Sequence, residues 1–183
     1  GFFTRTSVQR GQELVLKLRT ADPQYHVEVY RTGYYDDVGA RLVARTKPRR
    51  APRQPAPHAD ARTGLVSASN WTASERFDTS QWPSGVYLAK LVSSGGSDDH
   101  AIVVVRDDTR ASDVLYLLSD TTYQAYNYWG GFSLYAGEDE PRAVRVAFDR
   151  PYSNSSHDQA DWYLRAEHGL VKWLEAQGYD VTY

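Results

Sequence analysis

The stretch VLYLLSDTTYQAYNYWGGFSLY (114–135) joins an apolar run to a loop crowded with aromatic side chains. The run VLYLLSD (114–120) is continuously apolar, which predicts a strand buried on both faces. A loop that leaves the C-terminal end of such a strand is the usual place for ligands in open α/β folds. We therefore expect the chemistry of this chain within residues 121–135. The loop contains Gly130-Gly131 and six aromatic residues, Tyr123, Tyr126, Tyr128, Trp129, Phe132 and Tyr135.

Downstream of the loop, the pattern is that of an α/β sheet. An acidic turn, EDEPR (138–142), precedes a second predicted strand, AVRVAFD (143–149), and YDVTY (179–183) starts a third. Between them we expect a helix from Asp161, with Asp158 or Asp161 as its N-cap and Gly178 as its left-handed terminating residue. Its apolar face recurs at three- and four-residue intervals and comprises Trp162, Ala166, Leu170, Val171, Trp173 and Leu174.

Strand, strand, helix and strand are the opening of a doubly wound α/β sheet. One helix can cover only one face of such a sheet. We therefore expect this second unit to be incomplete and to be completed by further polypeptide, as a separate chain or as a later part of the same protein. Homo-oligomers and hetero-oligomers are both compatible with this expectation.

Upstream of the aromatic loop, short strands alternate apolar and polar residues. They are expected at 13–20, 25–31, 41–46, 85–94 and 100–107, with turn residues between them. This spacing favours a two-sheet β-sandwich of immunoglobulin-like type. The small and charged segment RDDTRASD (106–113) marks the predicted boundary between a sandwich at 1–108 and an α/β unit at 109–183. The fold class is therefore mixed α+β.

The segment TKPRRAPRQPAPHADA (46–61) contains four prolines and four basic residues, which predicts an extended, exposed loop. Such a segment is either a basic arm that docks an acidic partner or nucleic acid, or a solvated excursion between strands. No aromatic residue is interleaved with the basic residues, which favours the solvated excursion.

Composition excludes several classes of function. The formal charge is -2, with Lys+Arg 21 and Asp+Glu 23, so no global field attracts nucleic acid. No apolar run approaches the roughly 18 residues of a membrane span, and the first residues lack the pattern of a signal peptide. Cysteine and methionine are absent, which excludes thiolate sites and predicts a processed or trimmed chain. The location, secreted or cytoplasmic, stays open.

Several stretches together resemble a known family. They are VEVYRTGYYDDVGARLV, SGVYLAKLVSS, VVRDDTRASDVLYLLSDTTYQAYNYWGGFSLY, VAFDRPYS and LVKWLEAQGYDVTY. From about residue 20 to residue 183 the chain resembles the large (beta) subunit of N,N-dimethylformamidase and its bacterial relatives. The resemblance implies an immunoglobulin-like sandwich that leads into a glutamine-amidotransferase-like α/β domain, of which this chain would hold the N-terminal part.

The resemblance also implies an amidohydrolase with a mononuclear non-haem iron held by two tyrosines and one glutamate. Such an enzyme hydrolyses the C–N bond of a small amide. The matching tyrosines are Tyr126, in the AYN motif, and Tyr135, in the SLY motif. The glutamate is expected beyond residue 183, so this chain alone is expected to be inactive. A replacement glutamate within the acidic turn is a weaker alternative, because such turns are usually solvated.

The same residues also permit simpler interpretations. Tyr126 and Tyr135 could pack at a sheet edge with their hydroxyls on backbone carbonyls. The expected substrate pocket comprises Tyr123, Gln124, Asn127 and Trp129, although the two amides could instead satisfy the loop backbone. No general base can be named. The alternative function is a non-enzymatic binding or assembly module at a cell surface, which would use the sandwich and the aromatic loop as its contact surface.

Overall fold

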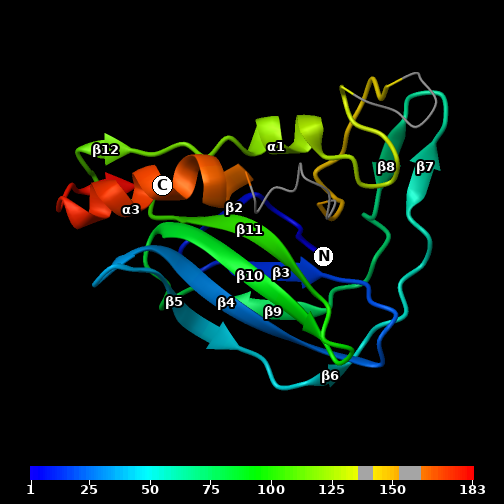
Figure 1. Ribbon diagram of the computed structural model, residues 1–183, viewed down its shortest axis with the longest axis horizontal. Coiled ribbons are helices and arrows are strands. Elements are labelled where there is room, and N and C mark those ends of the chain that lie inside the picture. Colours follow the sequence, from blue (N-terminus) through cyan, green and yellow to red (C-terminus); the bar gives the residue numbers. More distant parts are fainter. Residues whose placement is uncertain (136–141, 153–161) are drawn as a thin grey trace.

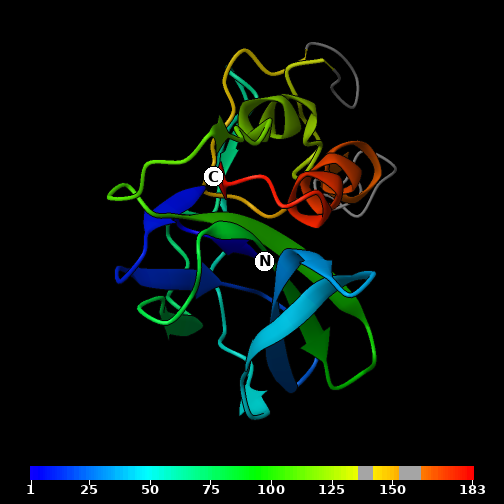
Figure 2. The same ribbon diagram turned by 90° about the vertical axis from the view of Figure 1, so that its left-hand side faces the viewer.

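The computed structural model describes residues 1–135, 142–152 and 162–183, which form a β-rich fold with few helices (Figure 1). Three layers stack on one another. A small sheet packs against one face of a large sheet, and a layer of helices covers the opposite face (Figures 1 and 2). The small sheet has the order β1 (Phe2–Phe3), β3 (Glu13–Lys17) and β9 (Glu75–Asp78).

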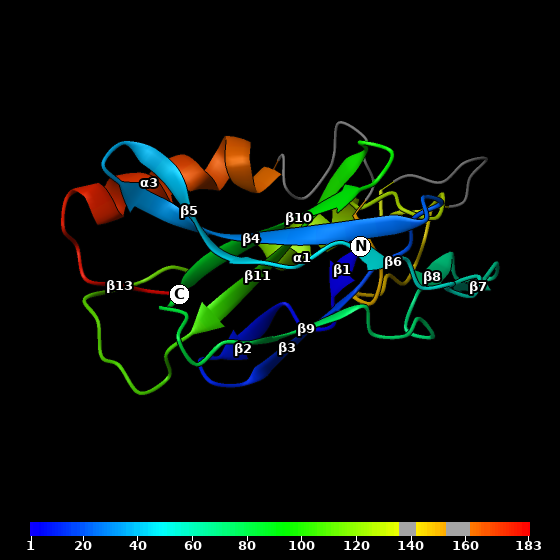
Figure 3. The same cartoon turned by 90° about the horizontal axis from the view of Figure 1, so that it is seen from below.

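The large sheet forms the middle layer, and its strand β4 runs across most of the width of the molecule (Figure 3). Its strands pair antiparallel, except that β2 runs parallel to β11. The order is β2 (Ser7–Gln9), β11 (Asp98–Arg106), β10 (Gly85–Ser93), β4 (Gln24–Tyr35) and β5 (Val38–Arg45), and β6 (Arg49–Arg50) also pairs with β4.

The central strands β10 and β11 are buried on both faces. Successive side chains of a strand point to opposite sides, so Tyr87 and Val103 enter the core shared with the small sheet. Their neighbours Val86, Ile102 and Val104 enter the core shared with the helical layer. The two-faced burial that we expected for 114–120 therefore belongs to β10 and β11, because these strands lie between two layers.

Strands β4 and β5 are longer than expected and meet in a tight hairpin. Tyr35 pairs with Val38, so only Asp36 and Asp37 form the turn. Their φ values are 48° and 69°, the two positive values that a type I′ turn requires. This turn matches the twist of the strands and extends the sheet where a longer polar turn was expected.

The helical layer also contains two short strands that pair in parallel. β12 (Val114–Leu115) pairs with β13 (Val181–Thr182), and between them in sequence lie α1 (Asp120–Tyr126), a π-helical turn η1 (Tyr163–Glu167) and α3 (His168–Ala176). Tyr116 and Leu118 pack inward, whereas Leu115 and Leu117 are 62% and 76% exposed. The expected seven-residue strand buried on both faces is thus wrong, since β12 is short and covered on one face.

The segment 143–149, expected to be a strand, is irregular. Val144 is 71% exposed, and its N–H donates to the carbonyl of Thr63 at 2.9 Å. The carbonyl of Asp149 accepts from the N–H of Ala68 at 2.6 Å. These bonds hold the segment beside β8 (Leu65–Ser67), which pairs with β7 (His58–Asp60). The basic segment 46–61, expected to be an extended, exposed loop, is mostly exposed and contains the short strands β6 and β7.

The expected helix is present, but its buried face differs. The N–H of His168 donates to the carbonyl of Tyr163, five residues earlier, which defines the π-helical turn. The extra residue shifts the face, so Tyr163 is fully buried. Of the expected apolar face only Val171 is fully buried. Gly178 ends the helix with φ 77°, as expected. The suggested caps Asp158 and Asp161 and the acidic residues 138–140 lie outside the described residues.

No helix within the described ranges combines the length and the apolar character needed to cross a membrane.

An ion pair fastens the helical layer to the large sheet. The guanidinium of Arg31 on β4 donates to Glu175 on α3, with N–O distances of 2.7 and 3.3 Å. Glu175 also accepts from the Tyr34 N–H at 2.9 Å and from the Tyr183 hydroxyl at 2.7 Å. Burial alone would raise the pKa of Glu175, but the hydrogen bond and charge of Arg31 lower it below its ordinary value of 4.5.

This pair predicts a loss of stability in acid. A carboxyl with a depressed pKa stabilises the fold above its unfolded value, and the contribution disappears as pH falls through the lowered folded value. We expect Glu175→Gln to reduce the free energy of unfolding near pH 7 by about 3 kcal/mol, because the Arg31 charge loses its partner. The stability of Glu175→Gln should also change less with pH below 4.5 than that of the wild type, because the variant lacks the carboxyl. Urea denaturation at several pH values measures both effects. Asp37→Asn is the control, and equal pH profiles for wild type and Glu175→Gln would contradict the assignment.

Candidate functional site

The first residues of the aromatic loop are helical, and the chain then folds back onto that helix. α1 ends at Tyr126, and Asn127 follows as its C-cap. Gly130 and Gly131 have φ values of 86° and 91°, which glycine adopts at little cost. At Gly130 a Cβ would lie 2.7 Å from the Val66 side chain. The two glycines thus allow a tight reversal that returns the chain to α1.

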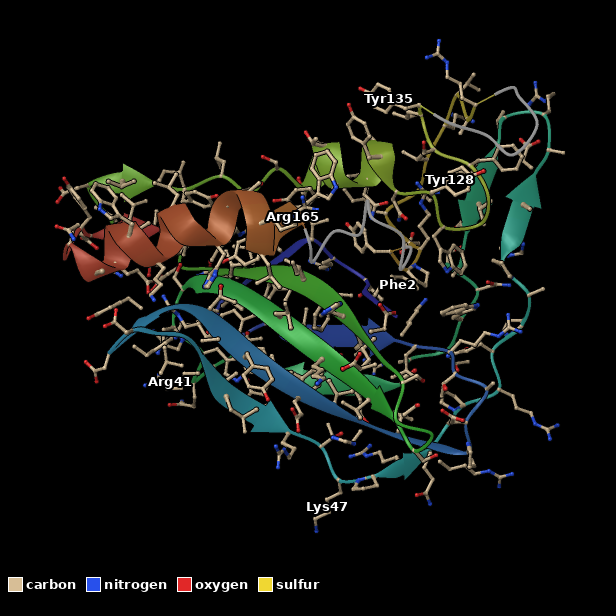
Figure 4. All side chains as sticks on the ribbon, in the orientation of Figure 1. Phe2, Arg41, Lys47, Tyr128, Tyr135 and Arg165 are labelled. Atoms are coloured by element: carbon tan, nitrogen blue, oxygen red, sulfur yellow. The ribbon has the colours of Figure 1, made fainter. Side chains whose placement is uncertain are left out.

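This reversal brings Tyr126 and Tyr135 together. The N–H of Leu134 donates to the carbonyl of Ala125 at 3.0 Å, which fixes the next residue beside the end of α1. The Tyr126 and Tyr135 rings stack with centroids 4.2 Å apart and an interplanar angle of 13°. Tyr135 is 57% exposed and lies at the outer edge of the molecule (Figure 4). The two tyrosines singled out by the sequence are therefore in direct contact.

The stack continues inward as a row of rings. Trp162 lies with its ring centroid 5.0 Å from that of Tyr126 and 6.2 Å from that of Tyr123. Tyr123 is buried. The row therefore runs from solvent at Tyr135 to the core at Tyr123, and Trp162 supports the back of the tyrosine pair.

Tyr123 and Tyr116 converge on one carboxylate, that of Glu167. The Tyr116 hydroxyl donates to Glu167 Oε2 at 2.6 Å, and the Tyr123 hydroxyl donates to Glu167 Oε1. Burial, together with the hydrogen bond to Glu167 and its charge, raises the pKa of both tyrosines far above the ordinary range. Both side chains therefore stay protonated donors. Sequence reasoning missed Glu167, because a glutamate on a helix is usually solvated.

The two amides of the expected substrate pocket are buried and engaged in the structure of the loop. Gln124 donates from Nε2 to the Tyr152 hydroxyl at 2.7 Å. Asn127 donates from Nδ2 to the carbonyl of Pro151 at 2.8 Å, and its Oδ1 accepts from the Trp129 N–H at 3.0 Å. The structure thus places both amides behind the loop surface, where they hold the backbone.

Arg150 is the centre of this buried network. Its guanidinium donates to the carbonyls of Gln124 and Asn127 at 3.1 and 2.9 Å, which lie at the C-terminal end of α1. It also donates to the carbonyls of Trp129 and Phe132 at 3.2 and 3.1 Å. A positive charge at a helix C-terminus is favourable. Arg150 thus ties the helix to both sides of the glycine reversal.

The environment of Arg150 contains neutral acceptors. The remaining Nε–H faces Gln124 Oε1 at 3.4 Å, and the side chain is fully buried. Burial lowers the pKa of Arg150 to about 10, so the guanidinium is charged at neutral pH. Sequence reasoning missed its role, although Arg150 lies in VAFDRPYS, one of the stretches that carry the family resemblance. The position of Arg150 in this stretch is the signal by which the sequence could have indicated its role.

Trp129 lines a surface pocket of about 650 Å³ beside the loop. Its ring meets that of Trp71 edge-on, with centroids 5.9 Å apart and an angle of 85°. Tyr128 and Tyr152 line the same pocket, and Arg19 and Asp99 supply charged groups. The structure therefore places Trp129, unlike Gln124 and Asn127, on a pocket that is open to solvent.

The donor set at the tyrosine pair is compatible with iron. Phenol oxygens are hard donors, and each of the two stacked rings carries one such oxygen. Within the described ranges no three His, Cys, Asp or Glu side chains gather into a metal-binding group. The phenol oxygens of Tyr126 and Tyr135 are of the chemical type that suits iron.

The fold defines a class: a β-rich protein whose large sheet carries a helical layer with a cluster of aromatic side chains. The family model described as N,N-dimethylformamidase beta subunit-like, C-terminal, matches residues 26–183. This chain belongs to that family and is, at this coarse level, a dimethylformamidase-like protein of amidohydrolase type. The description of a beta subunit is consistent with partner subunits. A comparison with curated proteins finds no match.

Proposed function

We propose that this chain supplies part of the active site of an amidohydrolase that cleaves the C–N bond of a small N-substituted amide. Tyr126 and Tyr135 would hold a mononuclear iron, and a glutamate from polypeptide outside this sequence would complete its ligands. The observation that carries the proposal is the stack of the two tyrosines at 4.2 Å, in a chain of this family.

The proposal extends to the architecture. The two facing sheets would be an immunoglobulin-like sandwich, and the layer of β12, α1, α3 and β13 would begin a glutamine-amidotransferase-like domain. The parallel pairing of β12 with β13 across intervening helices supports this interpretation, because such crossovers are typical of α/β folds. A boundary near residue 108 remains a prediction.

Each residue around the pair has a defined task in this proposal. Iron would polarise the amide carbonyl and lower the pKa of a bound water. Trp162 supports the inner face of Tyr126 through ring contact. Arg150 fixes the carbonyls on both sides of the glycine reversal, so the two phenols keep their relative position. Tyr123, held by Glu167, forms the wall behind them.

Substrate would approach from the exposed side of the pair. Trp129 and Tyr128, which belong to the same loop, line a pocket of about 650 Å³, within the usual range for small-molecule sites. Gln124 and Asn127 would shape this region through the loop backbone, because their amide groups are engaged with Tyr152 and Pro151. Hydrolysis adds water across the C–N bond and releases a carboxylic acid and an amine.

Metal analysis tests the proposal. We expect the intact protein, purified with its partner polypeptide, to contain about one iron per copy of this chain and to show a visible phenolate-to-iron absorption band. Iron-free protein that hydrolyses amides at the full rate would overturn the metal assignment.

A second candidate is a non-enzymatic binding or assembly module. The exposure of Tyr135 and the aromatic lining of the pocket favour it, because exposed aromatic residues are common at binding surfaces. Tyr126→Ala would then abolish ligand binding in a protein that never contains iron. The metal content therefore separates the two functions.

A further inference from the structure

A second pocket, of about 460 Å³, lies on the sandwich between the turn that follows β3 and the basic segment that follows β6. Three arginines line it, Arg19, Arg50 and Arg53, together with a single carboxylate, Asp22. The lining therefore has an excess of two positive charges. The sequence marked this segment as basic, and the proposed hydrolase does not use it.

Strand geometry explains why Arg50 faces the pocket. β6 pairs with the start of β4, with Arg50 opposite Gln24 and Arg49 opposite Tyr25. Adjacent side chains on a strand point to opposite sides. Arg49 points to the side of Glu75, with an N–O distance of 3.3 Å, so Arg50 points to the other side. The strand thus separates an arginine with a counterion from one that lines the pocket.

Among the described residues, the pocket arginines differ from their neighbours in forming no ion pair. Arg45 pairs with Glu28 at 2.7 Å, and Arg49 pairs with Glu75. Across the ranges that the structure describes, no carboxylate forms an ion pair with Arg19, Arg50 or Arg53.

Asp22 offsets only part of the positive charge of the pocket. It accepts a hydrogen bond from the Gly95 N–H at 3.2 Å, and it is the only acidic residue of the lining. Lys47, which precedes β6, points away from the molecule (Figure 4) and is not part of the lining. The positive charge of the pocket therefore belongs to the three arginines alone.

The walls of this pocket are held by hydrogen bonds. The N–H of Ala51 donates to the carbonyl of Pro23 at 2.9 Å. Gln54 donates from Nε2 to the carbonyls of Leu18 and Thr72 at 3.1 and 2.9 Å, and its Oε1 accepts from the Thr72 N–H at 2.8 Å. These hydrogen bonds therefore join the two sides of the pocket.

We propose that this pocket binds the phosphate group of a small ligand. A phosphate ester carries about two negative charges on one compact group near pH 7, which matches the excess positive charge of the lining. Guanidinium groups bind phosphate through paired hydrogen bonds. The volume suits a small molecule. The proposal rests on contacts in the sandwich and does not depend on the hydrolase or its iron.

Calorimetric titration of the purified protein with inorganic phosphate and with glycerol phosphate tests the proposal. Arg50→Gln and Arg53→Gln should each weaken binding about tenfold, the loss expected for one charge-assisted hydrogen bond. Asp22→Asn should strengthen binding, since it removes the opposing charge. Arg5→Gln is the matched control, because Arg5 is exposed and lies outside the pocket, and should bind phosphate like wild type.

The two ligands also show where the phosphate comes from. Tighter binding of glycerol phosphate indicates an esterified ligand, and tighter binding of inorganic phosphate indicates free phosphate. Tighter binding of succinate than of either ligand contradicts a site for phosphate. Equal binding by Arg5→Gln, Arg50→Gln and Arg53→Gln contradicts this location, and circular dichroism verifies that each variant is folded.

Discussion

Tyr126→Phe and Tyr135→Phe should each remove iron from the protein and lower kcat/KM for amide hydrolysis by at least about a thousandfold. In the proposed function each substitution would delete one ligand oxygen, and a catalytic metal supplies several kcal/mol of transition-state stabilisation. The phenyl ring remains, so the stack at 4.2 Å should survive, because ring stacking does not need the hydroxyl. Iron content, the visible absorption band and steady-state kinetics are the measurements.

Tyr128→Phe provides the matched control for these variants. Tyr128 lies in the same loop and lines the neighbouring pocket, and its hydroxyl has no role in the proposed ligand set. We expect wild-type iron content and a small change in KM. If Tyr126→Phe retained both the iron and the visible band, Tyr126 would not be a ligand, and the metal would have to be sought elsewhere in the assembly.

Arg150→Met should lower the free energy of unfolding by about 3–5 kcal/mol, the usual loss when a buried charged network is broken. The substitution leaves carbonyls of the α1 end and of the glycine reversal without their donor. Burial of an unsatisfied carbonyl costs about 1–3 kcal/mol, and relief of the desolvated charge offsets part of that sum. Urea denaturation measures the change.

Two further variants make the Arg150 prediction specific. Arg150→Lys keeps the charge but loses the planar fork of donors, so its stability should lie between wild type and Arg150→Met. Arg145→Met, at an exposed position, should leave the stability unchanged. Equal stability of Arg145→Met and Arg150→Met would show that the buried guanidinium does not hold the loop.

Strand positions could be predicted where apolar and polar residues alternate along the sequence. Leu14 and Leu16 on β3, and Val27 and Val29 on β4, are buried as the period of two requires. The apolar run 114–120 was misassigned for a physical reason. Periodicity does not reveal whether a second layer covers a run, and here the second layer covers β10 and β11 while Leu117 faces solvent.

The sequence could nominate the tyrosine pair but could not place its supports. Tyr126 and Tyr135 meet because one backbone bond, from Leu134 to Ala125, closes the reversal. Glu167 contacts Tyr123 and lies in a π-helical turn. No regular residue spacing in the sequence predicts such a turn. Arg150 is a buried cation in a turn-rich segment, against the usual exposure of arginine. Family-specific motifs can flag such residues, but only tertiary contacts give them a role.

The burial of β10 and β11 on both faces has a consequence for the order of folding. Val86, Ile102 and Val104 form the floor on which Tyr123, Tyr163 and Val171 assemble. Because synthesis proceeds from the N-terminus, this floor can exist before the tyrosine pair is made. β12 and β13 are far apart in sequence, so their pairing closes a long loop at an entropic cost. Packing of this loop on the large sheet, which is already folded, offsets that cost. The large sheet thus provides the surface on which the helical layer folds, and a substitution that slows its formation can disturb the tyrosine pair without contacting it.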